Sequence, residues 1–167
     1  MKTTTKFLAR SAAIAAVYAS LTLILSPISF GSMQLRASEA LSVLAYFSPT
    51  AVVGLAIGCA VANMWSPYGL VDIIFGSLAT LLAAYITYKL PKRGVWKYIA
   101  PLPSVIINSA VISAVITFSA ANSQVSMQIF LANALSIALP QALVCYGLGL
   151  PLMLWLDSSG IARRIFN

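Results

Sequence analysis

The sequence predicts an all-α integral membrane protein whose chain crosses the membrane six times. Of its 167 residues, 60% are hydrophobic and only 8% are charged, and the mean hydropathy is +0.94. Soluble domains carry about 25% charged residues. Most of the apolar stretches are long enough to span a bilayer, and polar turns separate them. We therefore expect residues 1–167 to form a single membrane domain, with no room for a separate soluble domain.

The net charge of +7 comes from ten Lys and Arg residues set against three acidic residues. In a soluble protein such an excess would suggest nucleic acid as a partner. Here the basic residues cluster at the ends of the apolar stretches, which is typical of membrane topology and of contact with lipid headgroups. We therefore expect membrane lipid, and no nucleic acid, around this chain.

The first span is expected at residues 6–26, after the basic residues Lys2, Lys6 and Arg10. A basic start before an apolar run also occurs in signal peptides. The residues that follow the run, Ser-Pro-Ile-Ser-Phe, form no clear small-x-small cleavage site, so we expect the helix to be retained. The basic residues place the N-terminus in the cytoplasm.

Alanines on the first span have the spacing of a close-packing face. Ala12 and Ala16 lie four residues apart and therefore share one side of the helix. Small residues at this spacing let the backbone of a second helix approach closely. The pattern fits packing within the bundle and docking on a partner protein equally well, so both interpretations stay open.

The count of six depends on how residues 38–64 cross the membrane. A proline divides this stretch into a short segment, 38–47, and a longer one, 51–64. If the stretch crossed once, the basic loop at 89–97 would lie outside, against the positive-inside rule. If it crosses twice, both termini and nine of the ten basic residues are cytoplasmic, and only Arg36 is outside. We therefore predict two spans, the short one shielded by neighbouring helices.

The remaining spans contain several prolines. We expect these spans at residues 70–88, 98–120 and 126–156. Pro101 and Pro103 fall in the first turns of one helix, where proline is tolerated. The last span is long, and Pro140 and Pro151 are expected to kink it.

Polar residues within or beside the spans mark the candidate site, which the topology places in the outer half of the bundle. These residues are Arg36, Glu39, Asn63, Asp72, Asn108 and Asn133. Ionisable groups at membrane depth usually serve a ligand or an ion, so Glu39 and Asp72 are predicted to accept hydrogen bonds from a substrate. Arg36 either pairs with Glu39 or contacts the ligand. Asn108 and Asn133 either bind the ligand or join the helices in a hydrogen-bond network.

These residue types favour a ligand with an amide or amidine edge. One carboxylate accepts two parallel N–H bonds, as from the N–C–N edge of a guanine-type ring. Two neighbouring acids would also suit a cationic amine. The sequence has no histidine, no phosphate-binding loop and no dinucleotide fingerprint. We therefore expect no metal site, no cofactor, no covalent catalysis and no ATP hydrolysis by this chain.

Three stretches resemble the QueT family. They read QLRASEAL at residues 34–41, followed by Pro49; DIIFGSLATLLA at 72–83; and GLGLPL at 147–152. QueT proteins are substrate-binding S-components of energy-coupling factor (ECF) transporters, predicted to import a queuosine precursor or a related 7-deazaguanine. The resemblance implies a six-helix bundle of the S-component type. It also implies a transmembrane coupling protein, the T-component, and two cytoplasmic ATPases as partners.

The resemblance also bears on individual residues. S-components of this kind commonly dock through alanines on the first helix, which favours Ala12 and Ala16 as the docking face. The family often has an acid in the middle of the last span, where this chain has Gln141. We include Gln141 among the substrate-binding residues, with a neutral amide in place of a charge.

Three other functions compete with this hypothesis. The chain could be an S-component for another purine-like or vitamin-like nutrient. It could be a self-sufficient secondary transporter that uses Glu39 or Asp72 as a coupling-ion site. It could also be a structural subunit without a ligand, in which the acids only join a hydrogen-bond network.

Overall fold

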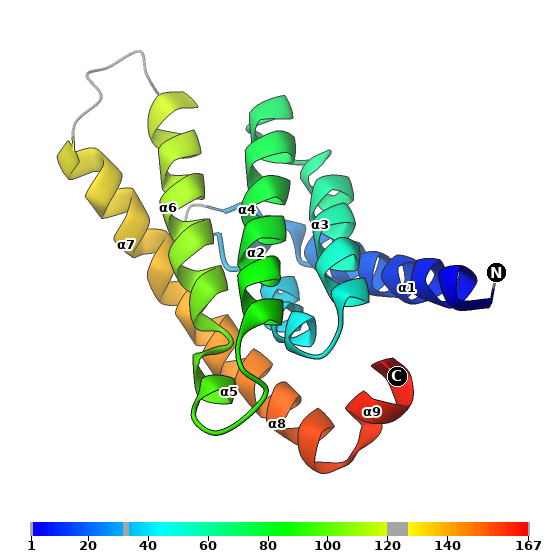
Figure 1. Ribbon diagram of the computed structural model, residues 1–167. Coiled ribbons are helices and arrows are strands. Elements are labelled where there is room, and N and C mark those ends of the chain that lie inside the picture. Colours follow the sequence, from blue (N-terminus) through cyan, green and yellow to red (C-terminus); the bar gives the residue numbers. More distant parts are fainter. Residues whose placement is uncertain (1, 32–33, 120–126, 167) are drawn as a thin grey trace.

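The computed structural model describes residues 2–31, 34–119 and 127–166, and every regular element within those ranges is helical. The elements are α1 (Lys2–Ile24), α2 (Ser26–Ser29), η1 (Ala37–Tyr46), α3 (Pro49–Asn63), α4 (Leu70–Lys89), α5 (Trp96–Ile99), α6 (Leu102–Ser119), α7 (Met127–Val144), η2 (Cys145–Gly149), α8 (Leu150–Ser158) and α9 (Ile161–Phe166). Figure 1 shows α3, α4, α6 and α7 side by side, with α1 packed against α3 and extending away from this row.

Four stretches are long and apolar enough to cross a membrane. They are Thr4–Ile24, Leu70–Lys89, Trp96–Phe118 and Met127–Ser158. The 15-residue α3 is apolar but shorter, and η1 has only ten residues. The all-helical, multi-pass prediction is confirmed, whereas the count of six spans stays a prediction.

The segment predicted as the short second span is a 3-10 helix at the centre of the bundle. η1 contacts α1, α3, α4, α7, α8 and η2. At about 2.0 Å per residue, its ten residues extend about 20 Å, whereas an α-helix of that length would extend about 15 Å. The stretched geometry lets a short segment reach further through the bundle. Glu39 lies in its first turn and is buried.

The α1 helix packs on α3 through glycines. A Cβ atom at Gly58 would lie 2.8 Å from the carbonyl oxygen of Ala15, and one at Gly54 would lie equally close to the α1 backbone. Glycine is therefore needed for this approach. Ala12 and Ala16 are exposed on another face of α1. Packing within the bundle therefore involves the buried Ala15 beside Gly58, whereas Ala12 and Ala16 lie on an exposed face of α1.

The last two predicted spans are each interrupted. A turn at Ala100 and Pro101 separates α5 from α6, so Pro101 lies at a break in the predicted span, whereas Pro103 lies in the first turn of α6 as expected. α7 continues into α8 through η2, a π-helical turn in which the Leu150 N–H donates to the Cys145 carbonyl. This wide turn directly precedes Pro151, which has no N–H to donate. Pro140, by contrast, lies inside α7.

The two ends of the bundle differ in charge. Successive helices α3, α4, α6 and α7 alternate in direction, so the α4–α5 loop and the C-terminal segment lie at the same end (Figure 1). That end carries Lys89, Lys92, Arg93, Lys97, Arg163 and Arg164. This arrangement agrees with the alternation that the positive-inside rule predicted for these loops.

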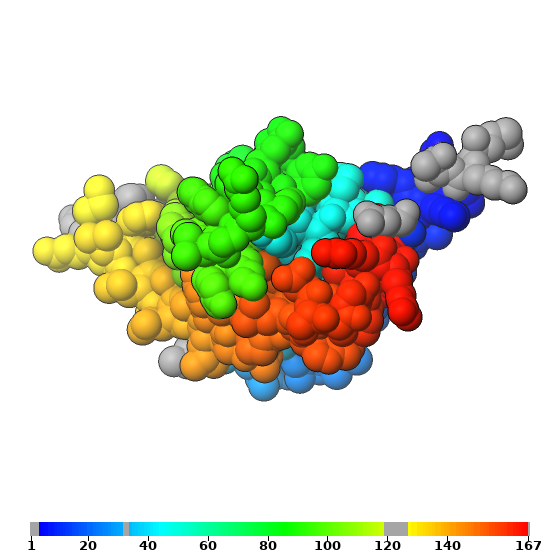
Figure 2. All heavy atoms as spheres, turned by 60° about the horizontal axis from the view of Figure 1, so that its bottom comes forward, coloured from blue at the N-terminus to red at the C-terminus, as the bar shows by residue number. Residues whose placement is uncertain are grey.

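The C-terminal segment closes the basic end. Figure 2 shows α8 and α9 lying across this face of the molecule. The ring of Phe166 stacks on Phe47, with 6.2 Å between the centroids. Lys92 donates to the carbonyl oxygens of Tyr46 and Tyr88, and burial lowers its pKa to about 8. These contacts fix the basic loop against the end of η1.

Candidate binding pocket

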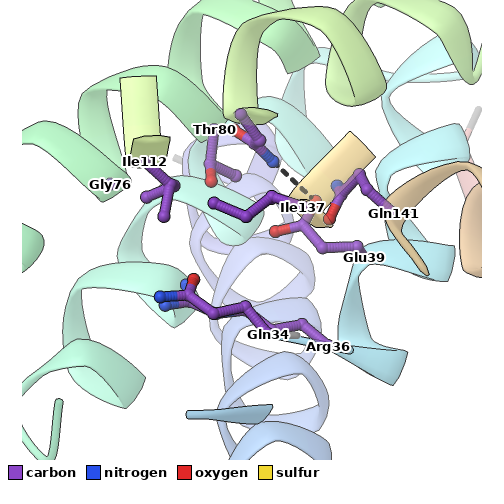
Figure 3. Close-up of a pocket in the computed structure, with 9 residues that line it drawn as sticks. Gln34, Arg36, Glu39, Gly76, Thr80, Ile112, Ile137 and Gln141 are labelled. Carbon is purple, nitrogen blue, oxygen red and sulfur yellow. Dashed lines mark hydrogen bonds between the residues drawn. The ribbon is translucent and has the colours of Figure 1, made fainter. Parts of the chain in front are cut away.

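A closed pocket lies where the start of η1 meets α4, α6 and α7. Its walls are formed by Gln34, Arg36, Glu39, Gly76, Thr80, Asn108, Ile112, Ile137 and Gln141. Figure 3 shows the side chains converging, with Gln34 and Arg36 together below Glu39. The side chains leave a free volume of about 10 Å³, which is room for about one water molecule. A larger ligand can enter only if the walls separate.

Glu39 is the central acid of the pocket and is only 2% exposed. The Tyr18 hydroxyl donates to its Oε1 at 2.5 Å. Asn108 Nδ2 donates to its Oε2 at 3.0 Å, the bond drawn as a dashed line in Figure 3. A carboxylate has about four lone-pair positions, so each oxygen can still accept another N–H. The protein therefore orients the carboxylate without saturating it.

Arg36 pairs with Asp72. Its Nη2 lies 3.2 Å from Asp72 Oδ2, and both side chains are buried. The ring of Phe30 lies 5.3 Å from the guanidinium carbon. The pairing with Glu39 that the sequence also allowed is replaced by this one, because Arg36 precedes η1 in an extended conformation and shares no helix face with Glu39. Arg36 is thus held as part of the pocket wall.

Asp72 and Asn63 lie behind the wall. Asn63 Nδ2 donates to the Asp72 carbonyl at 2.9 Å, and Ser66 donates to Asp72 Oδ2 at 2.6 Å. A Cβ atom on Gly76 would lie 2.6 Å from Asn63 Nδ2 and 3.0 Å from Asp72 Oδ1. Glycine at position 76 therefore allows both side chains to come up against the wall. Neither of them lines the pocket itself.

The two predicted residues of α7 have different positions. Gln141 lines the pocket, and its side chain lies beside Glu39 in Figure 3. Asn133 does not line it, and its Nδ2 donates to Thr117 Oγ1 of α6 at 3.1 Å. For Asn133 the geometry favours the helix-joining role that the sequence left open.

Sequence reasoning did not select Tyr18, Gln34 or Thr80. Tyr18 was detectable, because Ser11, Tyr18 and Thr22 are spaced seven and four residues apart and give α1 one polar stripe. All three residues of that stripe are buried. Gln34 is the first residue of the QLRASEAL stretch, which directly precedes and enters η1. Thr80 lies one helical turn after Gly76 on the face of α4 that lines the pocket.

Buried polar atoms without a hydrogen-bond partner concentrate at this pocket. Among the described residues, those in its walls are Gln34 Nε2, Arg36 Nε and Asn108 Oδ1. Asn63 Oδ1 and Asp72 Oδ1, behind the wall, are also unpartnered. Such atoms are rare in folded proteins because each one loses its hydration without compensation. Their concentration here indicates a site completed by a polar ligand or by water.

Comparisons with known proteins agree on one family. A family model described as the QueT transporter matches residues 8–158. The chain is similar to a protein of Lactococcus lactis subsp. cremoris (strain MG1363) named Queuosine precursor transporter QueT, with 41% identity over 73 residues. That alignment covers 42% of this chain and 43% of the relative, so less than half of either protein is compared. No solved structure matches the chain.

Proposed function

Because this chain belongs to the QueT transporter family, we propose that it is the substrate-capturing S-component of an ECF importer for a queuosine precursor. The relative in Lactococcus lactis carries that substrate in its name. The observation that carries the proposal is the buried Glu39 carboxylate, oriented by Tyr18 and Asn108 in a pocket with unpartnered polar atoms.

The substrate is a planar 7-deazaguanine. Its N–C–N edge offers two parallel N–H groups, which match the two oxygens of Glu39. Asn108 and Gln141 lie close enough in the wall to add directional hydrogen bonds. Asp72 and Asn63 support the wall from behind Gly76 and hold Arg36 in place. The pocket walls part to admit the base and close around it.

The chain forms one domain of six membrane spans, with η1 and α3 as the second and third. η1 is shielded by neighbours on several sides, which reduces the cost of its short length. Both termini lie in the cytoplasm with the basic end of the bundle, where they face the ATPases. The pocket then opens toward the outside of the cell membrane.

Energy for uptake comes from partner proteins. The sequence contains no phosphate-binding loop, so two cytoplasmic ATPases and a T-component supply the driving force. Ala12 and Ala16 form the docking face for the T-component, since they are exposed on α1 and small enough for close helix approach. The loaded chain reorients as a body on that partner and releases its substrate inside.

The test is equilibrium binding of a ligand panel to the purified protein in detergent. The panel contains queuine, its precursor bases, queuosine, guanine and riboflavin. We expect one deazaguanine to bind tightly and riboflavin not to bind. Glu39→Ala should weaken that binding about 100-fold or more, because it removes a charged acceptor of two hydrogen bonds. Asp157→Asn is the matched control, since this acid lies at the basic end of the molecule, away from the pocket.

Each alternative function has its own result. Binding of another nutrient, with no deazaguanine bound, would change the substrate and keep the S-component role. Uptake by the chain alone, driven by a proton or sodium gradient, would make it a secondary transporter. Wild-type behaviour of Glu39→Gln in every assay would leave only the structural role.

A further inference from the structure

The pocket has a donor side that the proposed contact with Glu39 does not use. Gln34 Nε2 and Arg36 Nε both lie in the wall, and neither has a hydrogen-bond partner. Gln34 is 3% exposed and Arg36 is 5% exposed. Figure 3 shows the two side chains lying together on one side of the pocket. An arginine Nε carries a proton and can only donate, so this side of the pocket demands an acceptor.

The opposite side presents acceptors. Glu39 retains free lone pairs on both oxygens. Asn108 directs its Nδ2 toward Glu39, which leaves its Oδ1 unpartnered in the same wall. The pocket is therefore polarised, with N–H donors at Gln34 and Arg36 and oxygen acceptors at Glu39 and Asn108.

The Arg36 side chain and the Gln34 backbone both have a defined conformation before any ligand arrives. Arg36 is held by the ion pair with Asp72 and by the ring of Phe30. Gln34 has a φ of +46°, and it is the one non-glycine residue with positive φ in the part of the chain that the structure describes. Such a conformation is strained for a residue with a side chain and is often found at binding sites. The strain at Gln34 accompanies a buried amide aimed at the pocket.

We propose that Gln34 and Arg36 recognise a carbonyl oxygen of the substrate, which makes the pocket selective for a lactam ring over its amino counterpart. The inference rests on the proposed function and defines which heterocycles the site accepts. In a 7-deazaguanine the carbonyl is adjacent to the ring N–H, and the exocyclic amine lies on the other side of that N–H. When Glu39 takes those two donors, the carbonyl faces the neighbouring donor side. In the amino counterpart, the amino group at that position would point its N–H groups at the N–H donors of Gln34 and Arg36. Its neighbouring ring nitrogen would carry no proton and would be an acceptor facing the acceptor Glu39.

The experiment compares two ligands, 7-deazaguanine and 2,6-diamino-7-deazapurine, by isothermal titration. The wild-type protein should prefer the lactam by about 100-fold or more, because the amino analogue leaves buried polar groups unpaired on both sides. Gln34→Met keeps a side chain of similar length and removes the donor. It should weaken lactam binding about 10-fold without weakening the amino analogue, so that the preference shrinks.

A second variant and a control complete the test. Arg36→Lys keeps a positive charge opposite Asp72 but loses the Nε donor, so it should also reduce the preference for the lactam. This variant replaces Gln34→Met in the test if Gln34→Met does not fold. Thr87→Val removes a different buried hydrogen bond, to the Ala100 carbonyl, and should leave the preference unchanged. An unchanged ratio in both pocket variants would overturn the donor-side proposal while the proposed function stands. A folded wild-type protein that binds neither these two bases nor any deazaguanine of the panel would overturn both.

Discussion

Tyr18→Phe tests whether α1 positions the acid of the pocket. The substitution removes one oxygen atom and keeps the aromatic ring, so packing around the 1% exposed side chain is preserved. What is lost is the hydrogen bond from the hydroxyl to Glu39 Oε1 at 2.5 Å. Thr22 on the next turn stays bonded to Ser38 at 2.6 Å, so α1 remains attached to η1.

The expected magnitude follows from the number of bonds that hold the carboxylate. Glu39 accepts one hydrogen bond on each oxygen, from Tyr18 and from Asn108. Arg36 does not compensate, because its hydrogen bond goes to Asp72. A hydrogen bond to a charged group contributes about 1.5–3 kcal/mol, so the free energy of unfolding should fall by about that amount. Substrate binding should weaken about 10-fold, since one of the side-chain hydrogen bonds that orient the carboxylate is gone.

Two measurements on purified protein decide the outcome. Denaturant unfolding in mixed micelles gives the change in stability, and calorimetric titration with the best-binding deazaguanine gives the change in affinity. Tyr85→Phe is the matched control, because its ring is half exposed and its contact with Lys89 uses the ring face and not the hydroxyl. If Tyr18→Phe equals the wild type in both stability and affinity, Glu39 is not positioned from α1.

Two further predictions concern other parts of the bundle. Ala16→Leu should leave ligand binding intact and prevent copurification with the T-component, whereas Ala15→Leu, on the buried face beside Gly58, should lower the free energy of unfolding by about 1–3 kcal/mol. Unchanged copurification of Ala16→Leu would contradict the docking face. Gly76→Ala should lower stability by about 1–3 kcal/mol and weaken ligand binding, because the methyl group must displace the amide of Asn63 from behind the wall. Wild-type affinity in a stable Gly76→Ala protein would show that this support does not matter to the ligand.

Composition and charge placement were enough to predict the helical membrane bundle. They also indicated that residues 38–47 form a separate segment, because only then do the basic loop near Lys92 and the C-terminal arginines lie on the same side as the basic N-terminus. The same reasoning could not predict that this segment is a 3-10 helix. Local hydrogen bonding in a short, buried helix is decided by what packs around it, and η1 is surrounded by several helices from distant parts of the chain.

The acids and amides of the pocket were predictable, but their pairing was not. Glu39 and Asn108 were selected because polar groups are costly among apolar helices, and Gln141 was selected from the family resemblance; all three line the pocket. Tyr18 is separated from Glu39 by 21 residues, and Arg36 from Asp72 by 36. Pairings of that kind depend on how two helices face one another. Gln34 was missed because its backbone strain and its burial arise only when the turn before η1 folds against α4 and α6.

The ion pair between Arg36 and Asp72 changes which substrates the pocket can recognise. From the sequence alone, the two acids Glu39 and Asp72 were compatible with a cationic amine as well as with a guanine-type edge. In the folded chain the charge of Asp72 is offset by Arg36, so Glu39 is left as the acid that faces the pocket. An isolated carboxylate can bind one amine, but an amine would leave the donors at Gln34 and Arg36 without an acceptor. A neutral lactam edge satisfies Glu39 and both donors at once, so the fold shifts recognition from charge to a pattern of donors and acceptors.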